Sequence, residues 1–379
     1  MPPPATHPLI EAARRVATEV LEPAAAQVDA TEVPRSHLQA LADAGLLGLF
    51  APVSVGGAGV SAAVFREVAE LLAGADAATW FVQAQHQSVV RMLAADGGTA
   101  GTGASPAAAK YLPRLVSGEI VAGFAFSHLR RYPDRPVTAR RVDGGWRLDG
   151  IAPWYTGWGL NDVAFLSGVT DDGEVIFGAV PAVDGGGLAM KTRLRTAALD
   201  AALTVVLSLE NVVIADDDIA LRQPHAEWLA GDAVVANANA AIFGVARSAV
   251  ALLREVGAAR HEEATIEAAE IFESELIDVR ARCYLLADEA PVTEAIEERL
   301  DCRAEALELL IAATSALVAA NAGQGMALSS AAQRKAREAL FLTVQAQTGP
   351  AREATLRRWS ASANARASER ATARARGRA

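Results

Sequence analysis

The run PWYTGWG at residues 153–159 places two tryptophans beside a tyrosine, a threonine and two glycines. It closes one predicted β-hairpin and precedes a second, in the strand-rich part of an otherwise helical chain. An aromatic ring next to a hydroxyl group suits a flat ligand that stacks on the ring and hydrogen-bonds at its edge. The alternative is structural, with Trp154 and Trp158 capping the core of the β-domain. The residues on either side of the run bear on this choice.

Strand patterns extend on both sides of this run. EIVAGFAFS at 119–127 has strand character, and LTVVLSLENVVI at 203–214 is another predicted strand. Two hairpin turns are indicated between them, Asp143-Gly144-Gly145 and Asp171-Asp172-Gly173, because Asp and Gly accept the left-handed backbone of tight hairpins. We expect five to seven antiparallel strands in a small sandwich or barrel.

Helical patterns occupy the rest of the chain, which is rich in alanine, the residue with the highest helix propensity. A glycine-rich turn at 51–60 and a flexible loop at 96–106 interrupt the first helices. Four long helices with apolar stripes follow the strands, at 230–257, 260–288, 291–321 and 329–348. The predicted fold is mainly α with a central β-domain. Its predicted parts are an N-terminal helical domain at 1–118, the β-domain at 119–222, a four-helix bundle at 223–359 and a disordered Arg/Ala/Ser-rich tail at 360–379.

The charge of the chain is acidic. The 379 residues carry 35 Lys and Arg against 45 Asp and Glu, a formal net charge of −10. An acidic protein is poorly suited to nucleic acid or to an anionic membrane surface. The N-terminus lacks a signal-peptide pattern, and polar residues break the longest apolar runs, so we expect a cytoplasmic protein without a membrane span.

Two further groups of residues have structural interpretations. Cys283 and Cys302 show no metal-ligand spacing and are expected to be reduced core thiols. Glutamate-rich runs at 262–275 and 294–308 predict exposed helix faces. Arginines at 280, 282, 299 and 303 are expected to pair with these glutamates at i,i+4 spacing.

The order of helical domain, small β-domain and helical bundle resembles the acyl-CoA dehydrogenase family over residues 8–358. GLLGLFAPVSVGGAG at 45–59, KYLPRLVSGEIVAGFAFS at 110–127 and Trp154-x-Thr156 carry the resemblance. It implies FAD as cofactor and an acyl thioester such as acyl-CoA as substrate. It also implies a dimer or tetramer built through the C-terminal bundle, and an electron-transferring flavoprotein as partner of a redox-active member.

The resemblance also assigns residues to the flavin. Ser127 is similar to the Thr or Ser that hydrogen-bonds the pyrimidine end, Trp154 to the Trp that lies against the ring, and Thr156 to the Thr that reaches N5. Donors at these places would stabilise the negative charge that reduction puts on a flavin. Arg260, Gly323 and Gly325 are weaker candidates for contacts at the adenine end.

The family's catalytic base is missing from its usual places. That base is a carboxylate, which removes an α-proton while the β-hydrogen leaves as hydride. Its two usual positions fall at Ala346 and Val234, and neither side chain accepts a proton. Asp232, close to Val234, and His128, beside Ser127, are weaker candidates for a base.

The adenine end departs from the family pattern as well. Arg260 is followed by HEEAT, whose glutamates 262 and 263 would repel a pyrophosphate. AANAGQG at 319–325 keeps Gly323 and Gly325 but has alanine where the family has glutamine.

These losses predict a particular kind of family member. FAD bridges two subunits in this family, and some members form assemblies in which one subunit lacks the base. The sequence therefore predicts a base-lacking subunit of an acyl-CoA dehydrogenase that works with a homologous partner. Two alternatives stay open: a self-sufficient flavin monooxygenase of the same fold, which needs no α-proton base, and a flavin-free structural or thioester-binding protein.

Overall fold

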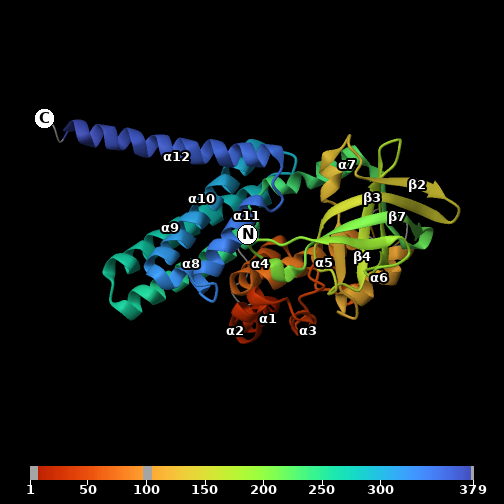
Figure 1. Ribbon diagram of the computed structural model, residues 1–379, viewed down its shortest axis with the longest axis horizontal. Coiled ribbons are helices and arrows are strands. Elements are labelled where there is room, and N and C mark those ends of the chain that lie inside the picture. Colours follow the sequence, from red (N-terminus) through yellow and green to blue (C-terminus); the bar gives the residue numbers. More distant parts are fainter. Residues whose placement is uncertain (1–6, 97–104, 377–379) are drawn as a thin grey trace. The chain divides into compact units, whose positions relative to one another are not determined.

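The computed structural model describes the backbone of residues 7–96 and 105–376 (Figure 1). Contacts between Cα atoms divide the chain into two compact units, Pro2–Ala230 and Gly231–Ala379. We call them the N-terminal and the C-terminal unit. Most of the loop predicted at 96–106 lies outside the described residues.

Helices form the first part of the N-terminal unit. Serine hydroxyls cap two of them, since Ser61 Oγ accepts from Val64 N–H (3.4 Å) and Ser105 Oγ from Ala108 N–H (3.1 Å). These caps satisfy amide donors that the first turn of a helix leaves unpaired. The helices are α1 (Pro8–Val16), the π-helical η1 (Ala17–Leu21), α2 (Glu22–Ala30), α3 (Arg35–Asp43), the 3-10 turn η2 (Val53–Val55), α4 (Ala62–Ala75), α5 (Ala77–Asp96) and α6 (Pro106–Val116).

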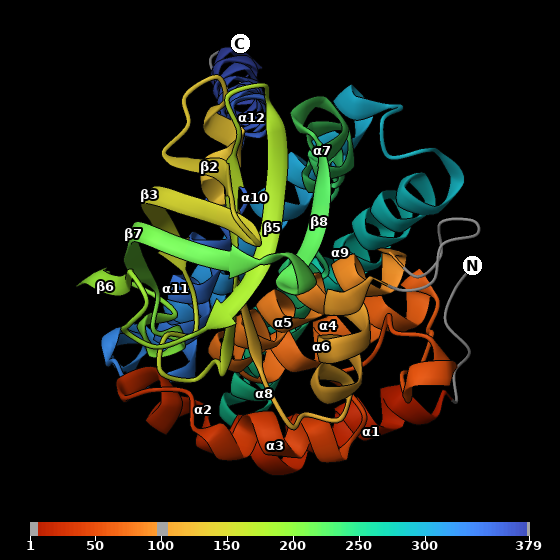
Figure 2. The same cartoon turned by 90° about the vertical axis from the view of Figure 1, so that its right-hand side faces the viewer.

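One eight-stranded sheet forms the rest of this unit. Its order is β6-β7-β3-β2-β4-β5-β8, and β1 pairs with β4 beside this path. Helix α5 packs against β1 and β8, and α6 against β8 (Figure 2). The strands are β1 (Ala122–Ala125), β2 (Val137–Val142), β3 (Gly145–Tyr155), β4 (Val163–Val169), β5 (Glu174–Pro181), β6 (Leu188–Arg193), β7 (Val205–Ala215) and β8 (Ile219–Pro224).

Both predicted hairpins are confirmed. Val142 pairs with Gly145 across the β2–β3 turn, and Val169 with Val175 across the β4–β5 turn. The prediction of a purely antiparallel sheet is wrong, because β1 and β2 both run parallel to β4. Strand β1 enters the sheet directly from α6 and is followed by a crossover through the 3-10 turn η3 (Ser127–Arg131), so it does not fold back on a sequence neighbour.

A β-bulge interrupts β3 in the middle of the PWYTGWG run. Ala152 pairs with Leu207 and Tyr155 with Val205, so β3 uses one more residue than β7 over this stretch. Trp154 lies in this bulge, and its φ of +62° is in the left-handed region. A bulge changes the direction in which a side chain leaves the sheet. Tyr155 is therefore turned into the core, where it is fully buried, and Trp154 is turned out to solvent.

The side chain of Asn161 holds this bend in place. Its Nδ2 donates to Tyr155 Oη at 3.0 Å and to the Thr156 carbonyl at 2.8 Å. The packing leaves no room for a side chain on the neighbouring strand, because a Cβ on Gly123 would lie 2.2 Å from both Asn161 Nδ2 and Tyr155 Oη. A Cβ on Gly157, which has a φ of +87°, would lie 2.5 Å from the same Asn161 Nδ2. Two glycines and one amide thus fix the bulge.

The C-terminal unit is a helical bundle. Helix α8 packs against α9, α10 and α11, and α10 also packs against α12. The elements are α7 (His225–Asp232), which ends in this unit, η6 (Ala233–Ala236), α8 (Ala240–Arg260), α9 (Glu263–Glu289), α10 (Ile296–Ala320), η7 (Ala322–Met326), α11 (Ala331–Val344) and α12 (Gly349–Arg376).

The bundle differs from the prediction at both ends. The helix predicted at 230–257 begins at Ala240, because Asn239 Oδ1 caps α8 by accepting from Ala241 N–H at 3.0 Å. A fifth helix, α12, joins the predicted four and continues to Arg376 (Figure 1). The tail was expected to be disordered from residue 360. Alanine and arginine are both strong helix formers, which explains why the helix continues through it.

Two of the predicted surface arginines are buried. Arg299 is 1% exposed and Arg303 is 4% exposed, so the prediction that they lie on exposed helix faces is wrong. Arg299 instead donates to Asn237 Oδ1 (2.6 Å) and to the carbonyls of Ala290, Pro291 and Glu294 (2.7–2.9 Å). Backbone carbonyls at the turn between two helices replace the water that a buried guanidinium loses.

By length and composition alone, the segment His225–Arg260 could cross a membrane. In the structure it comprises α7, η6 and α8, and α8 buries one side against the rest of the bundle. A core helix of this kind passes the same test, so the segment is weak evidence for a membrane span.

Replacing Asn161 by Asp tests the role of the amide in holding the bend. The ionised carboxylate cannot donate to Tyr155 or Thr156, and it would be buried beside a carbonyl oxygen. We expect the N161D variant to lose about 3 kcal/mol of stability at pH 7. The loss should shrink as the pH falls, because burial favours the protonated acid. The measurement is urea or thermal unfolding followed by circular dichroism.

The matched control is Asn364→Asp on the exposed face of α12. Its unfolding midpoint should stay within error of the parent protein at every pH. Equal midpoints for N161D and N364D at pH 7 would rule out the proposed role of the amide.

Candidate functional site

Trp154 is the most exposed residue of the predicted ring-contact segment. Its side chain is 58% exposed, and its backbone occupies the left-handed region that residues with a side chain rarely adopt. Trp158 instead packs edge-on against Tyr155, with ring centroids 5.9 Å apart, and adds to the sheet core. The core-capping interpretation therefore holds for Trp158 and fails for Trp154. Backbone strain that presents an aromatic ring to solvent is typical of ligand sites.

Ser127 lies next to this segment. It is half-buried at the start of η3, and its Oγ donates to the carbonyl of Pro153 at 3.3 Å. The end of β1 thus meets the bulge of β3. The structure brings together two predicted flavin contacts, Ser127 and Trp154, that lie far apart in sequence.

Thr156 lies in the layer beneath the indole. It is 1% exposed, and its Oγ1 is 3.1 Å from Thr204 Oγ1. Two hydroxyls that share one hydrogen bond retain one proton for a further acceptor. Sequence reasoning did not identify Thr204 or Asn161, and both act on this segment from outside it.

His128 is buried behind the same strand end. It is 1% exposed, and its Nε2 lies 3.0 Å from the Ser167 carbonyl and 3.3 Å from Ser167 Oγ. Burial lowers the pKa of His128 to about 4, against a smaller opposing effect of the bond to Ser167. A base has to reach its substrate. This burial favours a structural role for His128.

The two usual base positions meet in the C-terminal unit. Arg303, reaching from α10, donates through Nη1 to the Val235 carbonyl and through Nη2 to the Gln345 carbonyl at 2.7 Å. It also approaches the Ala346 carbonyl at 3.4 Å, and Asn239 Nδ2 donates to Gln345 Oε1 at 3.2 Å. The segment of Val234 and the turn of Ala346 are therefore held side by side. Neither position carries a carboxylate.

Asp232 lies at the end of α7, just before η6, and is half-buried. It belongs to the same chain segment as Val234. Sequence reasoning missed Arg303, because its i,i+4 spacing suggested a surface pair. No sequence pattern indicates that Arg303 lies between the segments of Val235 and Gln345, each of which is more than 40 residues away in the chain.

The three adenine-end candidates also converge. Arg260, the last residue of α8, donates through Nη1 to the carbonyl of Ala320 at the end of α10. Gly323 and Gly325 follow in η7. Gly325 is required by packing, since a Cβ there would lie 2.7 Å from the Val318 carbonyl oxygen, whereas a Cβ on Gly323 would meet nothing within 4 Å. Arg260 therefore caps the end of α10. Of the two glycines, only Gly323 has free space around its Cα.

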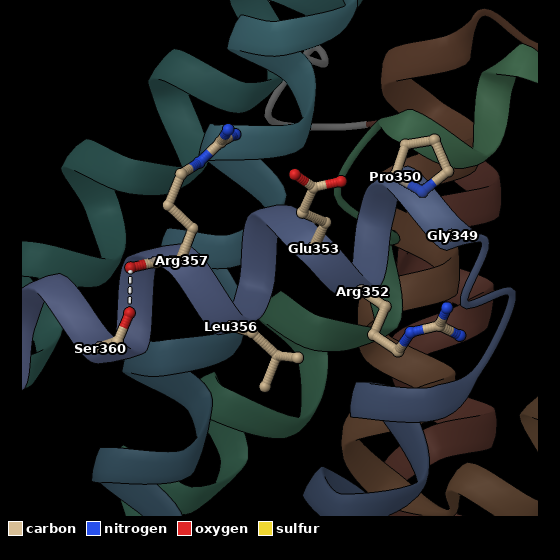
Figure 3. Close-up of a pocket in the computed structure, with 7 residues that line it drawn as sticks. All are labelled: Gly349, Pro350, Arg352, Glu353, Leu356, Arg357 and Ser360. Carbon is tan, nitrogen blue, oxygen red and sulfur yellow. Dashed lines mark hydrogen bonds between the residues drawn. The ribbon is translucent and has the colours of Figure 1, made fainter.

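Other candidate sites are weaker. A hollow on the surface of the C-terminal unit is lined by side chains of one helix face, which makes it an open groove and not an enclosed cavity (Figure 3). Its lining residues are Gly349, Pro350, Arg352, Glu353, Leu356, Arg357 and Ser360. Among the described residues, no three His, Cys, Asp or Glu side chains are grouped as a metal site would need.

Solved structures define the class of this fold. The chain superposes on a chain from the electron transferring flavoprotein study of Acidaminococcus fermentans with a TM-score of 0.78 and 18% identity, covering 95% of this chain and 99% of that one. Butyryl-CoA dehydrogenase from Megasphaera elsdenii gives 0.74 at 17% identity, over 92% and 96%. Dibenzothiophene monooxygenase from Paenibacillus sp. A11-2 gives 0.74 at 18%, over 90% and 93%. The chain has the acyl-CoA dehydrogenase fold.

The sequence comparison agrees with the fold. Residues 4–119 match the family described as acyl-CoA dehydrogenase, N-terminal domain. No curated protein sequence matches the chain. The similarity to this family therefore comprises the matched N-terminal part of the sequence and the fold of the whole chain.

The buried histidine makes stability depend on pH. Because the folded-state pKa of His128 is about 4 and the ordinary value is 6.5, the unfolded chain takes up the proton first as the pH falls. The stabilisation is complete above about pH 6.5 and is lost between pH 6.5 and 4. We expect His128→Gln to remove about 2 kcal/mol of the loss between pH 8 and pH 5. The measurement is urea unfolding across this range.

Each protein serves as its own control at pH 8, where the imidazole is neutral in both folded and unfolded chains. A constant stability difference between parent and H128Q at all pH values would contradict the assignment.

The two glycines of η7 give a matched pair. Gly325→Ala should lower stability by about 1–3 kcal/mol, because the new methyl group would overlap the Val318 carbonyl. Gly323→Ala should be neutral or slightly stabilising, because its methyl group points into open space and alanine lowers the entropy of the unfolded chain. Thermal unfolding of both variants measures the difference. Equal losses for the two would show that the backbone of η7 is placed differently.

Proposed function

We propose that this protein is a flavin-binding subunit of an acyl-CoA dehydrogenase-type oxidoreductase. It would act in the α,β-dehydrogenation of an acyl thioester, with FAD as cofactor. It would lack a base of its own and would work as one member of a complex with a homologous subunit. The acyl-CoA dehydrogenase fold and the match of residues 4–119 to the N-terminal domain of that family support the class of reaction.

The residues on the ring side fit a flavin in part. The outward indole of Trp154 offers a flat surface for stacking, and Ser127 beside it offers a hydroxyl donor. Bound FAD would supply the hydride acceptor. The task of this chain would be to hold the ring against Trp154 and to keep water from that face. Thr156 would contribute through the hydroxyl proton that its hydrogen bond with Thr204 leaves free for a further acceptor.

The observation that carries the proposal is the junction at Arg303. Arg303 joins the segments of Val234 and Ala346, which we infer to be the two places where the family has its base. The residues there, Val234 and Ala346, cannot take an α-proton. Removing that proton needs a positioned carboxylate. In this proposal the base comes from the partner subunit.

The adenine end supports dependence on a partner. Arg260 is engaged with the Ala320 carbonyl, and Glu262, which accepts from Thr265 Oγ1 at 3.0 Å, adds negative charge nearby. This chain alone would bind a pyrophosphate weakly. The partner would be a homologous acyl-CoA dehydrogenase subunit in a dimer or tetramer, and an electron-transferring flavoprotein would accept the electrons. We place the complex in the cytoplasm.

A second candidate is a self-sufficient flavin monooxygenase. The similarity to dibenzothiophene monooxygenase favours it, because oxygen insertion needs no base for an α-proton. A flavin-free thioester-binding protein is the third. The exposed, strained Trp154 argues against the third, since solvation of a large apolar ring has no structural benefit.

The visible spectrum of the protein separates these functions. Purified alone, the chain should carry FAD well below one per chain, and it should gain flavin when co-expressed with a homologous subunit. A butyryl-CoA or longer acyl-CoA should then bleach the flavin of the complex. Stoichiometric FAD on the isolated chain, unreactive with acyl-CoA and reoxidised with oxygen insertion, would favour the monooxygenase. Absence of flavin in both preparations would overturn both flavin functions.

Trp154→Ala tests the ring contact within the complex. We expect about a tenfold loss of FAD affinity, as the loss of one aromatic stacking contact predicts. The unfolding temperature should stay unchanged, because the indole is exposed. The matched control is Val183→Ala, another exposed apolar residue of the N-terminal unit (60% exposed). Unchanged FAD affinity in W154A, measured by flavin fluorescence, would remove Trp154 from the site.

A further inference from the structure

The only two cysteines of the chain lie opposite each other in the α9–α10 hairpin. Cys283 precedes the end of α9 at Glu289 by as many residues as Cys302 follows the start of α10 at Ile296. Cys283 Sγ donates to the Cys302 carbonyl at 3.5 Å, so the two residues are in contact. Both are free thiols, as the sequence predicted; Cys283 is buried and Cys302 is half-buried. Their symmetric spacing about the turn was the signal that could have revealed the pair.

The turn that pairs them is held in register. Arg299 donates to three carbonyls of the 290–294 connection between the helices, at 2.7–2.9 Å, and is fully buried. A sliding movement of α9 along α10 would break these bonds. The hairpin therefore keeps Cys283 and Cys302 opposite each other on neighbouring helices, and a disulfide requires that its two cysteines lie close together.

The two thiols differ in a way that suits a two-step reaction. Cys283 is 5% exposed, whereas Cys302 is half-buried and accessible to a small molecule. The hydrogen bond from Cys283 lowers the pKa of the Cys302 thiol to about 7. Arg282 acts in the same direction, and burial, Glu305 and Asp301 oppose it. The same hydrogen bond, together with burial, raises the pKa of Cys283.

We propose that Cys283 and Cys302 form an oxidation site, at which a peroxide converts the pair into a disulfide between α9 and α10. The site is independent of the flavin and of the proposed function. In cytoplasmic proteins, paired thiols of this kind serve redox sensing more often than structural stabilisation. The disulfide would link the two helices of the hairpin covalently.

The reaction proceeds in two steps. The Cys302 thiolate attacks one peroxide oxygen, the O–O bond breaks, and the leaving oxygen takes up a proton to become water or an alcohol. This leaves a sulfenic acid on Cys302. Cys283 sulfur then attacks the Cys302 sulfur, the S–O bond breaks, and the departing hydroxide takes the Cys283 proton as water. The two sulfurs lose two electrons in total, which the peroxide gains; a dithiol reductant reverses the change.

Mass spectrometry of the full-length protein tests this site. Hydrogen peroxide is added in increasing amounts, the remaining thiols are alkylated, and the protein is digested with trypsin. Cleavage after arginines 282, 299 and 303 places the two cysteines on separate peptides, 283–299 and 300–303. We expect these peptides to become disulfide-linked in the monomer and to separate again after dithiothreitol. Peptides that stay unlinked while Cys302 passes to the sulfinic acid would overturn the proposal, as would a link between two chains on a non-reducing gel.

Two variants assign the roles of the sulfurs. Cys283→Ser should stop at a Cys302 sulfenic acid, which dimedone traps. Cys302→Ser should slow the oxidation of Cys283 at least about tenfold, because that thiol is buried and protonated. Equal peroxide reactivity in the two variants would contradict the assignment. Circular dichroism establishes that each variant is folded. Whether the disulfide forms is decided by the linked peptides of the parent protein, independently of the variants.

Discussion

Two hydrogen bonds from one buried amide determine how this protein presents its aromatic segment. Asn161 Nδ2 binds Tyr155 Oη and the Thr156 carbonyl, and so holds Tyr155 in the core while the bulge turns Trp154 outwards. A left-handed tryptophan is costly, and it persists only where its surroundings over-determine it. Here the surroundings are the amide and the close approach of Gly123. The exposure of Trp154 is therefore set by contacts within the N-terminal unit.

In the C-terminal unit, the guanidinium of one arginine holds two backbone segments together. Arg303 is buried and bound to backbone carbonyls of two segments, which keeps the segments of Val234 and Ala346 together. Such bonds involve main-chain oxygen atoms, so they do not depend on which side chains the segments carry. A carboxylate can be lost from either segment while the local backbone is preserved. The backbone arrangement of these two segments is therefore independent of their side chains at positions 234 and 346.

Local patterns predicted much of the fold. The two Asp-Gly hairpins and the apolar stripes of α9 and α10 follow from short-range preferences of the backbone and from amphipathic spacing. The parallel pairing of β1 with β4 did not, because it joins segments separated by the whole β2–β3 hairpin. The burial of Arg299 and the pairing of Cys283 with Cys302 likewise depend on which helices become neighbours. Net charge and spacing carry no information about that.

The sequence by itself determined the order of helical and strand regions and the resemblance of its N-terminal part to the acyl-CoA dehydrogenases, since these depend on residue identity and local spacing. Tertiary structure decided which of those residues face solvent and which meet. It turned Trp154 outwards, placed Thr156 beneath it, buried His128 and Arg303, and brought two cysteines into contact. The physical reason is that exposure and long-range contact arise from packing between segments, which no single segment specifies.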